Sequence, residues 1–247
     1  MNDALRLVAG LSLAGIAAYA ATPVAMRLAA HFDFYDHPGG MVYKDHARPV
    51  PYLGGVAVVF AFVGGVALTS GGGLSDAAPI LGGTLLSMVV GTLDDRRPIP
   101  ALARVAFEAA LGIGLWAAGL GWDLGVGTPL DAVATAVWVV AVVNAFNLFD
   151  NMDGVAASAA AVAAAGIALL PAGGDPWLPV AGAVLCGACA GFLPYNLASP
   201  PRVFLGDGGS MALGFATAAL VTVGARHAGS ELQAVLMALL LVGLPGL

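Results

Sequence analysis

Charged residues are scarce in this sequence, and that scarcity excludes most soluble folds. Asp, Glu, Lys and Arg make up 10% of the 247 residues, whereas globular domains carry roughly 25%. Hydrophobic residues make up 60% of the chain, and the mean hydropathy is +0.91. One soluble core cannot bury that much apolar surface, so the composition indicates a protein whose solvent is the lipid bilayer. We expect no nucleic-acid partner.

Cysteine is nearly absent. Cys186 and Cys189 form a C-x-x-C pattern, which in a soluble protein beside a βαβ unit would suggest redox chemistry. Here both cysteines lie inside an apolar stretch rich in alanine and glycine. We therefore interpret them as small packing residues.

The apolar residues form nine segments separated by short loops. A membrane-spanning helix needs about 20 mostly apolar residues, so the sequence predicts an all-α polytopic membrane protein with about nine transmembrane helices, in a single domain over residues 1–247. The first segment is too long for a cleaved signal peptide, and we interpret it as a retained span. The segments are Ala4–Ala30, Tyr52–Thr69, Ala78–Leu93, Ala101–Leu120, Leu130–Ala145, Val155–Leu170, Trp177–Tyr195, Ser210–Gly224 and Leu232–Leu247.

Two kinds of loop alternate along the chain. The loops after the second, fourth, sixth and eighth segments are short and rich in Gly, Pro and Ser, which is typical of tight turns. Those after the first, third, fifth and seventh segments hold nearly every residue capable of chemistry, at residues 31–51, 94–100, 144–154 and 196–209. Because successive helices cross in opposite directions, these four polar loops are predicted to emerge on one side of the membrane.

The basic residues indicate which side that is. Only Arg6 and Arg226 lie near the other loops, whereas seven basic residues lie near the polar loops: Arg27, Lys44, Arg48, Arg96, Arg97, Arg104 and Arg202. Lys and Arg accumulate in cytoplasmic loops. The sequence therefore predicts a plasma-membrane protein with its N-terminus outside and its polar loops, including the catalytic ones, in the cytoplasm.

The first polar loop leads into the pattern K-x-H-x-x-P-x-P-x-x-G-G, from Lys44 to Gly55. Lys44 and His46 are suited to phosphate at the membrane surface, while the prolines stiffen the chain and the glycine pair permits close backbone approach. The alternative interpretation is a basic surface loop with a turn.

Asp94 and Asp95 end the third segment. Adjacent carboxylates are able to bind Mg²⁺ together with phosphate oxygens, or to accept a proton. Their place at the C-terminal end of a helix is electrostatically unfavourable, which favours a functional role over the alternative of a surface salt-bridge loop.

The fifth segment ends in Asn144-Ala145-Phe146-Asn147-Leu148-Phe149-Asp150-Asn151-Met152-Asp153-Gly154. If this stretch is helical, steps of three residues from Asn144 through Asn147 and Asp150 to Asp153 form a polar strip. Polar groups at membrane depth are costly unless partnered and therefore indicate a site. An exposed, capped turn is the alternative.

The eighth segment is preceded by Phe204-Leu205-Gly206-Asp207-Gly208-Gly209-Ser210. The glycines let backbone N–H groups face a ligand, and the start of the following helix favours phosphate. Gly-Asp-Gly is also an ordinary turn sequence. Taken together, the four loops hold carboxylates for a divalent cation, basic side chains for phosphates and backbone donors, as phosphoryl transfer requires.

These four motifs resemble those of the polyprenyl-phosphate N-acetylhexosamine-1-phosphate transferases. The matching patterns are K-x-H-x-x-P-x-P-x-x-G-G, D-D, N-A-x-N-L-x-D-x-x-D-G and F-x-G-D-x-G-S, in the order and spacing of that family. The resemblance implies that a polyprenyl phosphate in the bilayer attacks the β-phosphorus of a UDP-N-acetyl-amino-sugar and releases UMP, in cell-envelope polysaccharide biosynthesis. It implies Mg²⁺ as cofactor, with Mn²⁺ as the alternative, and a homodimer is compatible with it.

The resemblance also implies roles for the acidic residues and their neighbours. Asp207 would be the principal metal ligand, with Asn147 near it. Asp94 would activate or position the lipid phosphate, supported by Asp95. Asp150 would line the diphosphate and ribose region.

The remaining implied roles concern substrate binding. Asp153 and Asn196 would hold the uracil, and Phe204 would stack on it, with Asn144 in the same substrate-binding motif. Lys44 and His46 would contact phosphate or substrate from the first loop.

The chain also departs from the family pattern. Members of the family continue beyond a ninth span into another cytoplasmic loop with His and Arg residues and further helices, and we expect this chain to lack them. Tyr43 replaces a common Arg, and Ser199-Pro200-Pro201 is an unusual linker. Two alternatives stay open: an impaired homologue that binds nucleotide-sugar or lipid, and an ion-coupled transporter. Transporters hold such groups near the bilayer midplane, whereas here they lie at helix ends.

Overall fold

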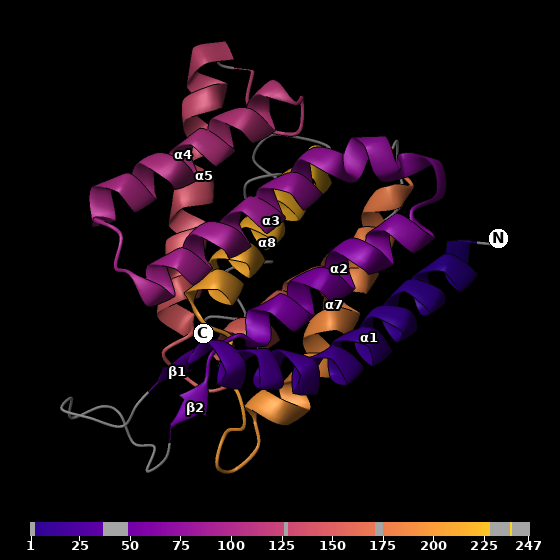
Figure 1. Cartoon of the computed structure of the whole chain (residues 1–247). Coiled ribbons are helices and arrows are strands. Elements are labelled where there is room, and N and C mark those ends of the chain that lie inside the picture. The colour runs from indigo at the N-terminus through magenta and orange to yellow at the C-terminus, as the bar shows by residue number, and fades with distance from the viewer. Residues whose placement is uncertain (1–2, 37–48, 126–127, 171–174, 228–237, 239–247) are drawn as a thin grey trace.

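The structure, a computed structural model, describes residues 3–36, 49–125, 128–170, 175–227 and 238, and these are largely helical (Figure 1). A two-residue antiparallel ribbon of β1 (Tyr35–Asp36) and β2 (Val50–Pro51) follows the first helix, and a short 3₁₀ turn, η1 (Gly71–Gly73), precedes the third. The helices are α1 (Asp3–Phe32), α2 (Gly54–Thr69), α3 (Leu74–Arg96), α4 (Ala101–Ala117), α5 (Thr128–Phe149), α6 (Val155–Ala168), α7 (Trp177–Asn196) and α8 (Asp207–Ala225).

The eight helices correspond in order to the first eight apolar segments of the sequence, which confirms an all-α polytopic membrane fold. Five of the described helices are long and apolar enough to cross a membrane, namely α1, α3 (counted with η1), α5, α7 and α8, while α2 and α6 are apolar but shorter. The ninth predicted segment, Leu232–Leu247, lies outside the described residues apart from Ala238.

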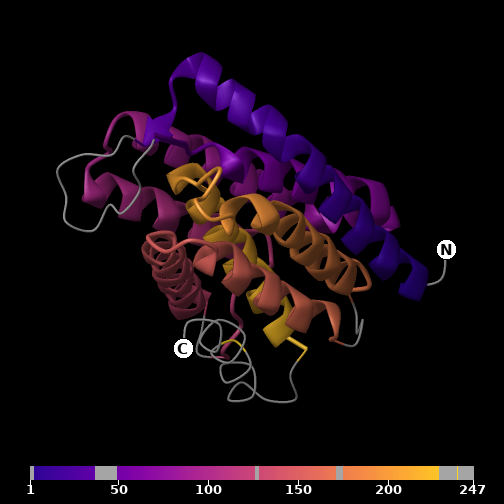
Figure 2. The same ribbon diagram turned by 90° about the horizontal axis from the view of Figure 1, so that it is seen from below.

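Helix α8 is the centre of the bundle. It packs against α3, α5, α6 and α2, while α1 lies at one edge of the bundle and α4 and α5 lie toward the other (Figures 1 and 2). Every residue from Gly208 to Ala225 is buried. A helix that is apolar on all sides, as this one is, must be covered all round.

The outward face of α1 is covered by large apolar side chains. In a soluble protein, so long an apolar strip would be a liability, but lipid is a suitable solvent for it. The exposed residues of this strip include Leu5, Val8, Ile16, Tyr19, Val24 and Phe32.

Four buried threonine hydroxyl groups are satisfied within their own helices, whereas the buried hydroxyl groups of Ser70, Ser87 and Thr217 have no hydrogen-bond partner among the described residues. Thr22, Thr69, Thr84 and Thr222 each donate a hydrogen bond to the carbonyl oxygen four residues earlier, at 2.7–2.8 Å. This local bond removes the need for a partner on another helix. Threonine is therefore tolerated inside apolar segments that water does not reach.

Helices α1 and α7 meet through glycine. A Cβ atom at Gly187 would overlap the carbonyl oxygen of Leu11, and one at Gly191 would overlap the carbonyl oxygen of Gly15. Small residues spaced by four permit such close backbone approach in membranes, where apolar burial alone does not drive helices together.

Gly187→Ala is expected to destabilise the protein by about 1–3 kcal/mol, because the added methyl group must push α1 away from α7. Gly82→Ala is the matched control, since a Cβ atom there meets no heavy atom within 4 Å and alanine is the better helix former. Thermal unfolding in detergent should show a lower Tm for the first variant and an equal or higher Tm for the second. Equal Tm values for Gly187→Ala and the parent would contradict this packing.

Candidate active site

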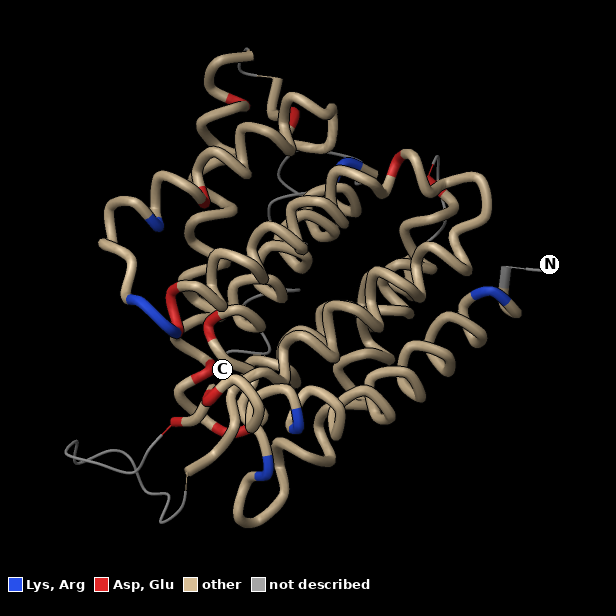
Figure 3. Tube along the Cα trace, viewed as in Figure 1, with Lys and Arg blue, Asp and Glu red and all other residues tan. Residues whose placement is uncertain are grey.

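The polar motifs meet at one end of the bundle, where α3 and α5 end and α4 and α8 begin. Figure 3 shows several acidic positions gathered at this end and others at the opposite end of the bundle. Four carboxylates lie here, those of Asp94, Asp95, Asp150 and Asp207, together with the guanidinium of Arg104. The predicted convergence of the second, third and fourth motifs is confirmed by the contacts between them.

A chain of side-chain contacts joins four elements. Arg104 on α4 pairs with Asp94 on α3 at 2.9 Å and donates to the amide oxygen of Asn147 on α5 at 3.5 Å. The amide nitrogen of Asn147 donates in turn to Asp207 at 2.7 Å and to the Ser210 hydroxyl at 3.2 Å, both on α8. The two residues predicted to lie at the metal, Asp207 and Asn147, are thus in direct contact.

Each carboxylate oxygen of Asp94 has a hydrogen-bond partner within the protein. Its second carboxylate oxygen accepts the backbone N–H of Ile99 at 2.5 Å, and its side chain is 6% exposed. In this arrangement Asp94 orients Arg104 and secures the turn between α3 and α4.

Asp95 and Asp150 accept hydrogen bonds from the backbone N–H groups at the start of α8 and just before it. Asp95 accepts the N–H groups of Asp207 and Gly208 at 3.1 and 3.2 Å, and Asp150 accepts that of Gly206. The sequence assigned these donors to a phosphate, but carboxylates from α3 and from the end of α5 take that place. A negative charge is favourable at the start of a helix, so Asp95 stabilises the position of α8.

The pKa of Asp150 is raised well above its ordinary value, mainly by burial and further by the neighbouring carboxylates of Asp207 and Asp95. Crowded like charges disfavour ionisation. A cation bound among these carboxylates would favour their ionised forms.

Glycine allows the loop before α8 to enter this cluster. Gly206 has a φ of +79°, which side-chain-bearing residues rarely adopt, and a Cβ atom there would overlap the carbonyl oxygen of Tyr52. The backbone N–H groups of Gly54 and Gly55 donate to the carbonyl oxygens of Phe204 and Leu205 at 3.0 and 2.9 Å. The glycine pair of the first motif thus holds the fourth motif in place.

The residues present fit Mg²⁺ in charge and in ligand type. Among the described residues no three His, Cys, Asp or Glu side chains form a ready-made metal cage. Mg²⁺ does not need one, because it is usually held by one or two carboxylates, with water and substrate phosphates as further ligands. Asp207 is the carboxylate placed to supply such a ligand. Asn147 lies beside it, with its amide nitrogen donating to Asp207 and its amide oxygen accepting from Arg104.

The polar strip predicted along α5 is only partly helical. Asn144 and Asn147 lie on the helix, but α5 ends at Phe149, so Asp150 and Asp153 lie in the turns that follow. Asp153 is exposed. The chain reverses at Gly154, whose φ is +76°.

The predicted substrate-binding amides both have partners within the protein. Asn144 donates to Glu108 at 2.5 Å and to the carbonyl oxygen of Val140 at 2.8 Å. Asn196, which is 4% exposed, accepts the N–H of Gly154 at 2.8 Å and donates to the carbonyl oxygen of Val203 at 2.9 Å. Asn196 thus joins the last residue of the third motif to the residue that precedes the fourth motif.

Of the three remaining predicted residues, the structure describes only Phe204. Phe204 is half-buried. Its backbone joins β2 to α2, because its N–H donates to the carbonyl oxygen of Pro51 at 2.8 Å and its carbonyl oxygen accepts the N–H of Gly54 at 3.0 Å. Lys44 and His46 lie outside the described residues.

Arg104 and Glu108 are members of the site that the sequence interpretation missed. Arg104 was counted only as a basic residue near a loop, and Glu108 was given no role. Both lie within a segment interpreted as a span, and ionisable residues inside a span are functional candidates by default. That signal was present in the sequence.

Comparison with known proteins agrees with this arrangement. Residues 77–225 match the model of glycosyl transferase family 4. The chain is 33% identical over 245 residues to the decaprenyl-phosphate N-acetylglucosaminephosphotransferase of Mycobacterium tuberculosis, covering 87% of this chain and 59% of that protein. It is 34% identical over 248 residues to the phospho-N-acetylmuramoyl-pentapeptide-transferase of Synechococcus elongatus, covering 90% of this chain and 66% of that protein.

The chain thus spans less than two thirds of the length of these two relatives. The matched region nevertheless runs from α3 to the end of α8 and contains Asp94, Asp95, Asn147, Asp150 and Asp207. On the strength of that match, the chain belongs to glycosyl transferase family 4.

Proposed function

We propose that this protein transfers N-acetylglucosamine-1-phosphate from a UDP-sugar to a polyprenyl phosphate such as undecaprenyl phosphate, releasing UMP. The observation that carries the proposal is the contact chain from Asp94 through Arg104 and Asn147 to Asp207, because it joins three separate motifs into one charged site at a helix end. The name of the M. tuberculosis relative supports N-acetylglucosamine over other amino sugars.

The reaction forms one phosphorus–oxygen bond and breaks another. A phosphate oxygen of the lipid attacks the β-phosphorus of the UDP-sugar, and the bond to the UMP oxygen breaks. Asp207, with Asn147 near it, would hold Mg²⁺, which would supply positive charge to neutralise the diphosphate. Arg104 lies against Asn147 and adds positive charge where the transferring phosphoryl group becomes more negative.

Incorporation of radiolabel tests the proposed function directly. Full-length protein, polyprenyl phosphate and UDP-[¹⁴C]GlcNAc should give a labelled lipid and an equal amount of UMP, and both products should require the acceptor lipid and Mg²⁺. Binding of UDP-sugar without labelled lipid would indicate the impaired homologue. Release of UMP without acceptor lipid would mean hydrolysis and would contradict transfer.

The uridine base is proposed to stack on Phe204, which begins the fourth motif and whose backbone is hydrogen-bonded to Pro51 and Gly54 of the first motif. Phe204→Ala is expected to weaken UMP binding by about 1–3 kcal/mol, on the scale of bases stacked on aromatic side chains. Phe204→Trp keeps an aromatic plane and should retain most of the affinity. Isothermal titration with UMP measures both, and unchanged affinity of Phe204→Ala would show that this ring only packs against the protein.

We further propose nine transmembrane spans, with the N-terminus outside and the site in the cytoplasm, from the distribution of basic residues. Cysteine introduced singly at the exposed positions Arg96, Asn151 and Arg202 should resist a membrane-impermeant thiol reagent in intact cells and react after permeabilisation. Cysteine at the exposed position Asp76 should react in intact cells. Labelling of any of the first three from outside would contradict the proposed orientation.

A further inference from the structure

Glu108 is a buried carboxylate on a mostly apolar helix. It is 1% exposed, and it shares the buried face of α4 with Gly112 and Leu115. Its Oε1 atom has no hydrogen-bond partner among the described residues. Burial of a carboxylate with an unsatisfied oxygen costs free energy that an apolar side chain would avoid. The position therefore indicates a role for Glu108 beyond packing.

The other carboxylate oxygen of Glu108 joins α4 to α5. It accepts a hydrogen bond from the amide nitrogen of Asn144 at 2.5 Å, and the same nitrogen donates to the carbonyl oxygen of Val140 at 2.8 Å. An asparagine amide has two N–H donors, so both are used within the protein. These bonds fix the orientation of the Asn144 amide and connect it to α4.

A second polar contact between the same two helices lies one helical turn nearer the site. Arg104 precedes Glu108 by four residues on α4, and Asn147 follows Asn144 by three residues on α5. Arg104 donates to the amide oxygen of Asn147 at 3.5 Å. Because residues three or four apart share a face of a helix, the two contacts lie one above the other.

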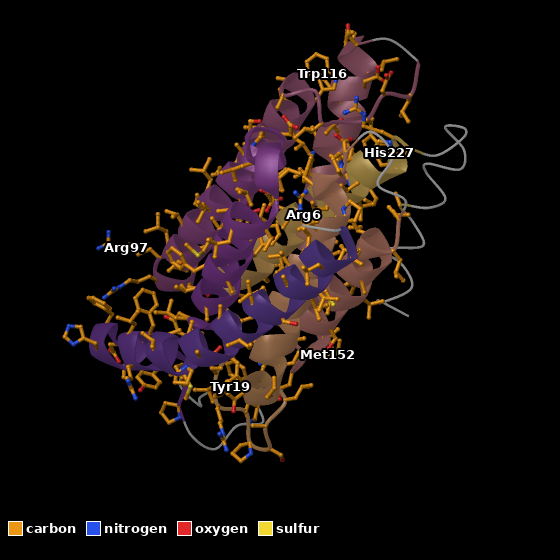
Figure 4. All side chains as sticks on the ribbon, turned by 90° about the vertical axis from the view of Figure 1, so that its right-hand side faces the viewer. Arg6, Tyr19, Arg97, Trp116, Met152 and His227 are labelled. Carbon is orange, nitrogen blue, oxygen red and sulfur yellow. The ribbon has the colours of Figure 1, made fainter. Side chains whose placement is uncertain are left out.

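Helices α4 and α5 run in opposite directions and approach closely. Helix α4 runs away from the site toward Trp116, and α5 runs back and ends shortly before Met152; Figure 4 shows these two residues toward opposite ends of the molecule. A Cβ atom at Gly112, one turn beyond Glu108, would lie 2.6 Å from the Cα atom of Ala136. At this separation, polar side chains of one helix reach those of the other.

Apolar contacts alone do not fix how far one helix is shifted along another in a bilayer. Lipid tails are as apolar as the side chains between helices, so neighbouring helices depend on close packing and on hydrogen bonds between them. A single buried polar contact is known to fix the register of helices in coiled coils. The Glu108–Asn144 bond is short and buried, whereas the Arg104–Asn147 contact is long and would open with a small shift of α4.

We propose that Glu108 is a positioning residue for the transfer reaction. Its hydrogen bond to Asn144 fixes the register of α4 against α5 and thereby places Arg104 at Asn147 and at the transferring phosphoryl group. Asn144 serves this contact instead of binding substrate. The inference rests on the proposed function and deepens it, because it identifies what holds Arg104 in position.

Two substitutions of Glu108 separate the hydrogen bond from packing. Glu108→Leu removes the acceptor for Asn144 and is expected to lower kcat for UMP release about 10- to 100-fold, because a misplacement of about 1 Å costs up to about 10²-fold. KM for the UDP-sugar and for the lipid should stay unchanged, since Arg104 is proposed to act on the transition state. Glu108→Gln keeps an oxygen acceptor for Asn144 and should retain most of kcat.

The double variant Glu108→Leu with Asn144→Leu distinguishes a positioning defect from a folding defect. It leaves neither partner of this contact buried and unpaired, so its unfolding temperature should equal or exceed that of the parent. Its kcat should be as low as that of Glu108→Leu. In an Arg104→Gln background, Glu108→Leu should lower kcat little further, because both changes remove the same contribution.

Electron-spin distance measurements test the helix register without any substrate. Spin labels are attached to cysteines introduced at the exposed positions Leu102 on α4 and Leu148 on α5, in full-length protein whose Cys186 and Cys189 are replaced by alanine. Glu108→Leu should shift or broaden the distribution of distances between the labels. Glu108→Gln should leave that distribution unchanged.

An unchanged distance distribution or a parental kcat for Glu108→Leu would overturn the proposal. Equal losses of kcat for Glu108→Gln and Glu108→Leu would show that the charge matters instead of the hydrogen bond, and a raised KM for the UDP-sugar in the double variant would show that Asn144 contacts substrate. Either result would overturn the proposal as well. If the parent transfers no sugar phosphate but Glu108→Leu still changes the distance distribution, the proposed function fails and the role of Glu108 in helix register stands.

Discussion

Asp207→Asn is expected to lower kcat for UMP release by about 10²-fold or more, the scale of removing a preorganised electrostatic group. The substitution keeps the size of the side chain and its contact with Asn147 but removes the charge proposed to hold Mg²⁺. Asp207 also lies among other carboxylates, so the loss of its charge should not unfold the protein. Unfolding temperature without Mg²⁺ is expected to stay level or rise, which separates a catalytic defect from a structural one.

The matched control for this substitution is Asp76→Asn. Asp76 is exposed in the first turn of α3, 18 residues before Asp94 on the same helix and hence roughly 27 Å away along its axis. Its variant should be nearly silent. A Mg²⁺ titration of both variants and of the parent completes the test, and parental kcat for Asp207→Asn at saturating Mg²⁺ and substrates would refute the proposed metal position.

Arg104→Gln is expected to lower the unfolding temperature by about 5–10 °C. The substitution leaves Asp94, whose side chain is 6% exposed, without its counter-charge. Removing one partner of a buried ion pair costs about 3–5 kcal/mol, and the partial exposure of Arg104, at 22%, places this pair toward the lower value. Arg104→Lys keeps the charge but not the reach to Asn147, so its unfolding temperature should lie between those of the parent and of Arg104→Gln.

The double variant Asp94→Asn with Arg104→Gln distinguishes the loss of an ion pair from two independent destabilising effects. With both charges removed, the unfolding temperature should be higher than that of Arg104→Gln alone and closer to that of the parent. Activity should stay low, because Arg104 is proposed to act on the transferring phosphoryl group. Additive losses in the double variant would show that Asp94 and Arg104 stabilise the protein independently.

Most of the fold was predictable from hydropathy. In a bilayer, backbone polar groups must be satisfied within the segment, so an apolar run of sufficient length becomes a helix. Eight of the nine predicted segments are helices in the described residues, and the chemistry-bearing loops of the second to fourth motifs meet as predicted. The ends of the helices were predicted less accurately. Helix α3 begins at Leu74, before its predicted start at Ala78, because a 3₁₀ turn of glycines leads directly into it.

The partners of individual polar residues were not predictable in the same way. Asp95 was assigned to the reaction, yet it caps α8 from a position 112 residues earlier in the chain. Asn196 was assigned to the uracil, yet it also joins Gly154 to Val203 within the protein. Spacing along one helix reveals which residues share a face, but it does not reveal which other helix that face meets.

The sequence by itself determined the class of the protein, the order of its helices and the motifs that carry its chemistry, because these depend on apolar length and on residue types at short spacing. Only the tertiary structure decided that Arg104 pairs with Asp94, and that Asp95 and Asp150 accept hydrogen bonds from backbone N–H groups at the start of α8 and just before it. These contacts depend on how closely the helices approach one another. That approach is set by three-dimensional packing at positions such as Gly91 and Gly208, where α3 and α8 meet and where a side chain would not fit.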